Sequence, residues 1–428
     1  MLDINFIREK REEVKKALLK RVGQVELDKV LDKVVQLDDK RKDYIQKVEE
    51  LKAERNKQSK TKPTPEVQKK MKLVGEKIEK LDKQIEKVEV DLRAGLYDLP
   101  NIPADDVVAG GKENNKVLRT SGKKPKLDSK AKDHVKLATD LGVVDYERAA
   151  KMSGSGFWVY TGDGALLEWA LLNYFIDFHR KNGYTFIFPP FLLNEESAFA
   201  SGHLPKFRED LYWAHAPDQA AAGSVRGKSR TGMCLNATSE MMLLNYHRDE
   251  ILDAKELPKK YFAYSACFRR EAGSYRKEER GMIRGHQFNK IEMFQFTKPA
   301  DSWKGFDELV SYAEKLVEGL GLHYQSVQLA AEDASAAMSK TIDIEVFIPS
   351  MNGYKEVSSI SNALDYQARR SNIRYKTKSG NEFLHTLNAS GLATSRLVPA
   401  ILEQGQRKDG SVEIPEVLRG FLGKDVLK

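Results

Sequence analysis

Residues 267–296, CFRREAGSYRKEERGMIRGHQFNKIEMFQF, place two apolar, strand-like runs on either side of a polar loop rich in arginine, lysine and glutamate. Alternate residues of a strand share one face. The polar faces carry Arg269 and Glu271 on the entering run, and Phe288, Lys290 and Glu292 on the returning run. A guanidinium fork binds phosphate and an aromatic face stacks on a base. We therefore expect this hairpin to bind a flat, anionic ligand such as ATP.

The same run resembles motif 2 of class II aminoacyl-tRNA synthetases, which reads Arg-x-Glu, a variable loop, then Arg-x-x-x-Phe. Here these residues are Arg269, Glu271, Arg284 and Phe288. The wording FRREAGS followed by RGMIRGHQFNKIEMFQ is similar to seryl-tRNA synthetases of the bacterial type. The alternative without a binding role is an ordinary surface hairpin with a solvated charged face. Two further segments argue against it.

The first segment is HTLNASGLATSRLVPAILEQGQ, residues 385–406. Small residues end a strand, and an apolar stripe at helical spacing follows. The segment resembles motif 3, a strand and a helix whose arginine, here Arg396, meets the ATP γ-phosphate. The free N–H groups at the start of such a helix also favour an anion.

The second segment is KEVSSISNALDYQARRSNIRY, residues 355–375, which is similar to the seryl enzymes almost throughout. The resemblance makes Glu356 a carboxylate ligand for the Mg²⁺ that accompanies ATP, since this hard ion prefers oxygen. Ser358 and Ser359 line the same edge. The adjacent Arg369 and Arg370 read as surface charge.

The serine pocket implied by the resemblance departs from the usual wording. Family members show Thr-Ala-Glu after an apolar-Pro pair, whereas this chain has Asn236-Ala237-Thr238-Ser239-Glu240. A site that hydrogen-bonds a hydroxyl rejects analogues that lack it. The expected serine-binding residues are Thr238, Ser239, Glu240, Arg269, Glu292, Asn388 and Ser390.

The resemblance also implies an ATP subsite in which catalysis is positioning and charge stabilisation. Arg269, Glu356 and Arg396 are the expected catalytic residues. Arg269 meets the α-phosphate and the serine carboxylate. No structural metal is expected. The full ATP-binding set is Arg269, Arg270, Glu271, Gly285, Phe288, Glu356, Val357, Ser358, Ser359 and Arg396.

Other departures from the family pattern leave amino-acid specificity open. Residues 216–232 look like an insertion ahead of the pocket, which we expect to be a mobile loop. Thr394-Ser395 stands where the family usually has an apolar residue and glycine, and Ala389 replaces a frequent glycine or cysteine.

Two heptad patterns near the N-terminus predict a pair of helices, about 27–59 and 65–98. The first seam is interrupted by Arg41, and Pro63 and Pro65 separate the helices. Helices of matched length joined by a short turn fold back antiparallel, so we expect a coiled-coil arm. The seam residues are Leu27, Val30, Val34, Leu37, Tyr44, Val48 and Leu51, then Val67, Met71, Val74, Ile78, Leu81, Ile85, Val88 and Leu92.

The arm is basic between residues 57 and 80, where lysines (57, 60, 62, 69, 70, 72, 77 and 80) outnumber three glutamates. Such a run is usually a solvated face. By the resemblance, however, the arm grips tRNA(Ser) through backbone phosphates and shape, with affinity that falls as salt rises.

The domain organisation follows from these segments. We expect a tRNA-binding domain at 1–103, a linker at 104–132 that includes an edge strand near 117–119, and a catalytic domain at 133–428. In the catalytic domain, motifs 1, 2 and 3 fall at about 164–190, 261–296 and 385–406. Motif 1 implies a homodimer with an isologous interface. The implied fold class is α+β: an antiparallel sheet flanked by helices, with the helical arm. His203, in a family-like GHLPKF run, reads as structural.

Composition agrees with an intracellular, nucleic-acid-binding enzyme. A net charge of +8 favours an anionic partner. Two cysteines, Cys234 and Cys267, give no disulfide framework and suit a reducing cytosol. There is no signal-peptide pattern and no apolar stretch long enough to span a membrane, so we expect a cytoplasmic protein.

The function implied is ATP-dependent attachment of L-serine to tRNA(Ser) through seryl-adenylate, with tRNA(Sec) as a further candidate substrate. Two alternatives remain at this point. One is a paralogue that passes a small amino acid to an acceptor other than tRNA, and the other is a non-enzymatic coiled-coil protein on an inactive synthetase fold.

Overall fold

The computed structural model describes residues 1–58, 64–126, 131–214, 232–271 and 281–428. The chain divides into two compact units, Met1–Pro103 and Ala104–Lys428, which are described separately. Lys60 and Lys62 of the basic arm, most of the 216–232 insertion and part of the motif 2 loop lie outside the described residues.

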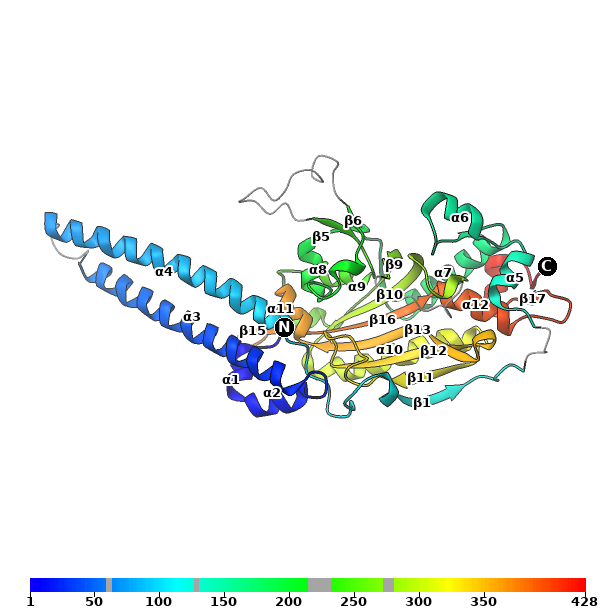
Figure 1. Ribbon diagram of the computed structural model, residues 1–428, viewed down its shortest axis with the longest axis horizontal. Coiled ribbons are helices and arrows are strands. Elements are labelled where there is room, and N and C mark those ends of the chain that lie inside the picture. Colours follow the sequence, from blue (N-terminus) through cyan, green and yellow to red (C-terminus); the bar gives the residue numbers. More distant parts are fainter. Residues whose placement is uncertain (59–63, 127–130, 215–231, 272–280) are drawn as a thin grey trace. The chain divides into compact units, whose positions relative to one another are not determined.

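The N-terminal unit is helical, and its two long helices form the expected antiparallel arm (Figure 1). Val34 lies against Gly95, and Glu54 pairs with Lys70 at 2.6 Å, so residue numbers rise on one helix as they fall on its partner. Heptad residues pack between them around Val48, Val74 and Ile78. The elements are α1 (Ile4–Glu9), α2 (Arg11–Leu18), α3 (Gln24–Gln58) and α4 (Pro65–Asp98).

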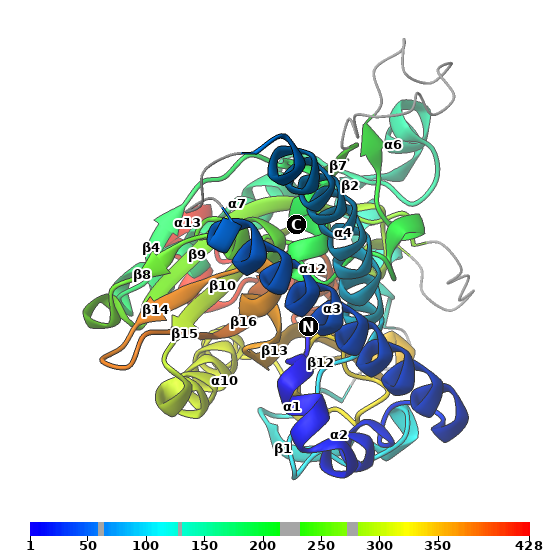
Figure 2. The ribbon, with the colours of Figure 1, turned by 90° about the vertical axis from the view of Figure 1, so that its left-hand side faces the viewer.

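The second unit is built on an eight-stranded sheet, whose strands can be followed by their labels from β4 to β12 in Figure 2. All neighbours are antiparallel except β4 and β9, which are parallel. In spatial order the strands are β1 (Lys116–Ser121), β11 (Tyr324–Gln328), β12 (Lys340–Ile348), β13 (Gly353–Leu364), β16 (His385–Ala393), β10 (Gln287–Thr297), β9 (Lys259–Phe268) and β4 (Thr185–Ile187).

Alternate side chains of β10 point to opposite faces of the sheet and pack in different clusters. Ile291 and Met293 point into the main hydrophobic core, which also contains residues of α7 (Asp163–Lys181), α10 (Ser302–Gly319) and α12 (Thr394–Gln404). Phe294 and Phe296 point the other way and pack with α9 (Glu240–Asn245) and α11 (Tyr366–Ser371). The part of this second face that α9 and α11 do not cover can carry polar groups.

Smaller elements complete this unit. The helices are α5 (His134–Asp140), α6 (Tyr146–Ser153), α8 (Glu195–Ser201) and α13 (Glu416–Leu422), with short 3-10 turns such as Arg208–Asp210 and Gly281–Ile283. The small sheets are β5 (Leu192–Asn194), β7 (Met233–Leu235) and β6 (Trp213–Ala214); β15 (Asn381–Phe383), β14 (Arg374–Lys376) and β8 (Ile251–Leu252); β2 (Val144–Asp145) and β3 (Val159–Tyr160); and β17 (Val412–Glu413) and β18 (Val426–Leu427).

One observed boundary differs from the sequence pattern. Strand β9 ends at Phe268, so Arg269 and Glu271 lie beyond the strand, and Glu271 adopts a left-handed backbone with φ of 52°. The edge strand predicted near 117–119 is confirmed as β1, which pairs with β11 at the edge of the main sheet. In the described parts of the chain no helix has the length and apolar character needed to cross a membrane.

Candidate active site

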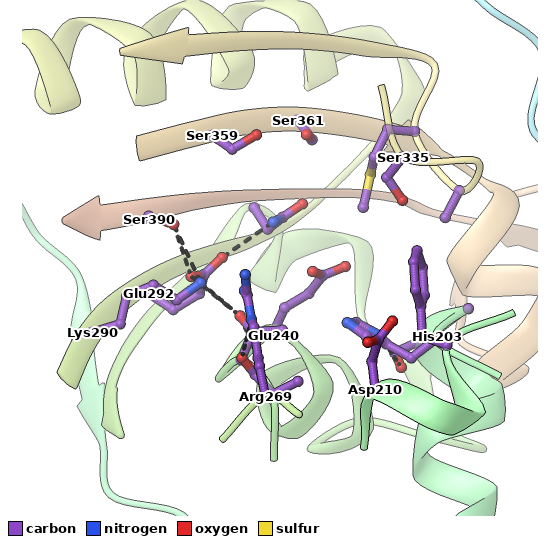
Figure 3. A pocket seen from close by; sticks show the side chains of 18 of the residues that line it. His203, Asp210, Glu240, Arg269, Lys290, Glu292, Ser335, Ser359, Ser361 and Ser390 are labelled. Carbon is purple, nitrogen blue, oxygen red and sulfur yellow. Dashed lines mark hydrogen bonds and ion pairs between the residues drawn. The ribbon is translucent and has the colours of Figure 1, made fainter. Parts of the chain in front are cut away.

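A cavity of about 490 Å³ opens on the sheet face opposite the main core. The strands β10, β13 and β16 form one wall, and the segment between α8 and the 3-10 turn at Arg208–Asp210 forms another. Figure 3 shows Lys290, Glu292 and Ser390 close together, with Arg269 and Glu240 beside them and His203 and Asp210 farther along the cavity.

The deepest polar cluster joins three elements through a buried ion pair. The Lys290 ammonium contacts the Glu292 carboxylate and donates to Thr238 Oγ1 at 2.8 Å and Ser390 Oγ at 3.3 Å. Asn388 Nδ2 donates to Glu292 at 3.1 Å. Four of these were predicted to bind serine, and Lys290 was not given a role. Its place between Phe288 and Glu292 on the period-two face was the signal for it.

Glu240 lines the same cavity but is held by a different neighbour. Gln367 Nε2 donates to its carboxyl at 2.6 Å, and Gln367 also accepts from Thr386 at 2.7 Å. Burial, followed by the negative charge of Glu292, raises the pKa of Glu240 to about 7. The group is therefore poised to ionise when a cation enters the cavity.

A smaller hollow continues from the cavity past Arg269. The Arg269 guanidinium lies 5.2 Å from the centroid of the Phe288 ring, and Arg284 pairs with Glu271 at 2.6 Å. A side chain on Gly285 would collide with the Trp158 ring, so only glycine fits there.

Arg396 and Glu356 meet at the far wall of this hollow. Arg396 Nη1 lies 3.4 Å from Glu356 Oε2 and donates to the Glu356 carbonyl at 2.7 Å. One cationic and one anionic group side by side suit a ligand that brings both phosphate and a divalent cation. Across the described residues, no three His, Cys, Asp or Glu side chains form a metal-binding group.

Four predicted residues do not line either hollow in the described structure. Arg270 points into solvent. Val357 lies in the main core, and Ser358 donates to the Ser390 carbonyl. Val357 and Ser358 turn away from the cavity because the β12–β13 register shifts between Ile344 and Glu345, which is a bulge in β13. Glu356, Ser359 and Ser361 face the cavity instead. The fourth is Ser239.

The residues that depart from the family's pocket sequence, Asn236 and Ser239, form hydrogen bonds with strand β9. Ser239 Oγ lies 2.7 Å from Ser265 Oγ, and Asn236 Nδ2 donates to Ser265 Oγ at 3.1 Å and to the Ala266 carbonyl at 3.0 Å. Both departures therefore point away from the cavity, which Ala237, Thr238 and Glu240 line.

Arg370 holds the segment of the cavity wall between Phe199 and Leu204. The sequence interpretation of Arg370 as surface charge is therefore wrong. Its side chain is buried and donates to the carbonyls of Phe199 and Leu204 at 2.9 and 2.8 Å. His203 lies between these residues. Burial, followed by the positive charges of Arg269, Lys290 and Arg370, lowers its pKa to about 3, so it is neutral.

Comparisons with known proteins match both units. Residues 1–103 match a family described as the seryl-tRNA synthetase N-terminal domain. Residues 225–405 match the tRNA synthetase class II core domain (G, H, P, S and T). Serine--tRNA ligase 2 of Clostridium acetobutylicum is 52% identical over 438 residues, which cover 100% of both chains.

Two solved structures are similar over their whole length. Seryl-tRNA synthetase from Pyrococcus horikoshii, complexed with ATP, gives a TM-score of 0.89 at 32% identity, covering 100% of this chain and 99% of that one. Cytoplasmic serine-tRNA ligase from Naegleria fowleri, in complex with AMP, gives 0.86 at 32% identity with the same coverage.

Replacing Arg370 by alanine should destabilise the second unit, because two buried carbonyls lose a charged donor. We expect Arg370→Ala to lower the free energy of unfolding by about 3 kcal/mol. Arg369→Ala, which removes a partly exposed pair with Asp365, should cost about 1 kcal/mol or less. All four tryptophans lie between residues 158 and 303, so guanidinium denaturation followed by tryptophan fluorescence reports this unit. Equal losses for both variants would contradict the assigned role.

Proposed function

The chain belongs to the seryl-tRNA synthetase family of class II aminoacyl-tRNA synthetases, and from that premise we propose that it joins L-serine to tRNA(Ser) in an ATP-dependent reaction. The observation that carries the proposal is the continuity of two subsites. The polar cluster around Glu292 borders the larger cavity. Arg396 and Glu356, which suit a phosphate and its cation, border the smaller hollow, and Arg269 lines both.

The reaction we propose has two steps. The serine carboxylate oxygen attacks the α-phosphorus of ATP, the Pα–O bond to the β-phosphate breaks, and pyrophosphate leaves. The terminal ribose hydroxyl of the tRNA then attacks the acyl carbon, AMP leaves with the bonding electrons, and the hydroxyl proton passes to a phosphate oxygen of the departing AMP. Neither step needs a nucleophilic side chain, so the protein contributes orientation and charge stabilisation.

The buried cluster supports serine as the amino acid. Glu292 and Glu240 offer carboxylates to the ammonium, and Thr238, Asn388 and Ser390 offer polar atoms to the hydroxyl. Lys290 balances the charge of Glu292 through their buried ion pair. A site of this kind binds an alcohol far better than its hydrocarbon analogue.

For ATP, we assign the base to Phe288 and Gly285, with Glu271 on the adenine side, the α-phosphate to Arg269 and the γ-phosphate to Arg396. Glu356 and the neighbouring Ser359 have the oxygen donors that Mg²⁺ prefers, and phosphate oxygens would complete its coordination. Bound there, Mg²⁺ would neutralise phosphate charge. The Arg396–Glu356 contact supports this pairing of roles.

We propose that the N-terminal unit binds tRNA(Ser) and that tRNA(Sec) is a further substrate, with both reactions in the cytoplasm. The match of residues 1–103 to the family's N-terminal domain, together with the lysine-rich helix α4, supports a tRNA partner. A full-length match of both units does not favour the alternatives of a non-tRNA acceptor or an inactive scaffold.

The first experiment is ATP–pyrophosphate exchange with serine, threonine, alanine and glycine in parallel, followed by charging of tRNA(Ser). We expect exchange with serine alone. Glu292→Ala should lower kcat/KM for serine by about a hundredfold or more, because it removes the group that pairs with the amino acid. Glu308→Gln, on α10 and paired with Lys260, serves as the control and should retain full activity. Exchange with another amino acid, or none, would refute the proposal.

Serine affinity should depend on pH through Glu240. Below about pH 7 this carboxyl is protonated, so binding the serine ammonium requires loss of a proton and weakens as pH falls. We expect affinity to drop by up to about tenfold per pH unit below 7. Calorimetry at pH 5.5 to 8, in buffers of different ionisation enthalpy, measures both affinity and proton release. Glu240→Gln should flatten the profile, whereas Glu168→Gln, a buried carboxyl outside the cavity with a similar pKa, should not.

We further propose that the protein is a homodimer whose interface includes an aromatic patch, defined here as the exposed Trp169, Phe186 and Phe188 together with the half-buried Tyr264. Phe188 is 71% exposed and Trp169 54%. The rings of Phe188 and Trp169 both lie about 6 Å from that of Tyr264. Residues of this kind favour burial against a second copy.

Phe188→Glu should therefore convert a dimer into a monomer, because a charge cannot be buried without a partner. Sedimentation velocity at micromolar concentration measures the outcome. Leu73→Glu, which changes an exposed leucine on α4, is the matched control and should leave the dimer intact. A monomeric wild type, or a dimeric Phe188→Glu, would contradict this interface.

A further inference from the structure

A buried carboxyl on α7 connects three elements behind the nucleotide subsite. Glu168 Oε1 accepts from Thr394 Oγ1 at 2.5 Å and from Asn289 Nδ2 at 2.8 Å. Thr394 Oγ1 is also 3.1 Å from the Asn289 carbonyl oxygen. The three residues belong to α7, β10 and the first turn of α12, which are far apart in the sequence.

These bonds lie on the opposite face of β10 from the cavity. Asn289 alternates with Phe288 and Lys290, so its side chain turns toward α7 while its neighbours face the substrate subsites. Tyr264 donates its hydroxyl to Asn289 Oδ1 at 3.0 Å, which orients the Asn289 amide so that its Nδ2 points to Glu168. The amide is therefore fixed from both ends.

Thr394 begins α12, two residues before Arg396. It is also one of the positions at which the sequence departs from the family pattern, since an apolar residue is usual there. A hydroxyl introduced into a buried site needs a partner, and Glu168 supplies one.

Glu168 is 4% exposed, and its second oxygen, Oε2, has no hydrogen-bond partner among the described residues. Burial raises its pKa to about 7. Burial of a carboxyl is costly unless its hydrogen bonds compensate, so the bonds from Thr394 and Asn289 tie α12 and β10 to Glu168.

We propose that Glu168 is a positioning residue which, through Thr394 and Asn289, fixes the first turn of α12 against β10 and so holds the Arg396 guanidinium at the nucleotide subsite. The inference rests on the proposed γ-phosphate role of Arg396. The helix α7 would then have two roles. Trp169, the residue after Glu168, belongs to the aromatic patch, and Glu168 supports ATP binding. A shift of the first turn of α12 moves Arg396 with it, and misplacement of about 1 Å is enough to weaken such a contact strongly.

The test measures ATP and serine affinities separately by calorimetry on the full-length protein, with thermal unfolding recorded in parallel. Glu168→Ala and Thr394→Val should weaken ATP binding by roughly tenfold and leave serine binding within about twofold. The conservative variants Glu168→Gln and Thr394→Ser keep an acceptor or a hydroxyl and should restore ATP affinity. The double variant Glu168→Ala/Thr394→Val should be no worse than either single one.

Glu403→Gln is the matched control, because it alters a buried carboxyl at the other end of α12 that binds His134 and Ser350. It should lower stability without changing ATP affinity. Unchanged ATP affinity in Glu168→Ala or Thr394→Val, or equal loss of ATP and serine binding, would overturn the inference. If Glu168→Ala does not fold, the Thr394→Val and Thr394→Ser pair decides. Since ATP binding is measured directly, a wild type that binds ATP but shows no serine-dependent exchange would refute the proposed function alone.

Discussion

The active-site face of the sheet depends on one buried ion pair, Lys290 with Glu292, whose side chains are 7% and 1% exposed. Two charges removed from water are stable only when each has close, well-oriented partners. Those partners, Thr238, Asn388 and Ser390, come from other segments of the chain. The pair therefore fixes β10, β16 and the start of α9 relative to one another. The largest apolar cluster lies on the opposite face, where α7, α10 and α12 pack.

Placing charges on one face and apolar residues on the other makes the strand register functional. A slip of one residue in β10 would bring Ile291 into the cavity and Glu292 into the core. Two of the register shifts in the sheet bear on the active site, one between Lys290 and Glu292 against β16 and one between Ile344 and Glu345 against β13. Both lie beside the cavity, where an extra residue re-aims side chains without disturbing the rest of the sheet.

The features that depend on local sequence pattern could be predicted. The helical arm is confirmed, and its heptads could predict it because they continue over many turns with one interruption, at Arg41. The alternation of β10 correctly grouped Phe288, Lys290 and Glu292. The features it could not carry depend on tertiary contacts. Ser358 turns away from the cavity because of a bulge that no periodicity reveals. Arg370 is buried because two carbonyls of a distant loop need a donor, and its neighbour Arg369 gives no hint of the difference. The individual roles of the site residues remain predictions.

The two faces of β10 also connect the aromatic patch to the nucleotide subsite. Tyr264, whose ring contacts Trp169 and Phe188, bonds Asn289, which in turn bonds Glu168 and thereby Thr394. A second copy packed on the patch would exclude water from the Tyr264 end of this series, and hydrogen bonds strengthen when water is excluded. Dimer formation and the placement of Arg396 would then favour each other, because binding free energies coupled through shared groups are reciprocal. The strand that defines the serine pocket on one face would in this way tie the interface to the ATP subsite through its other face.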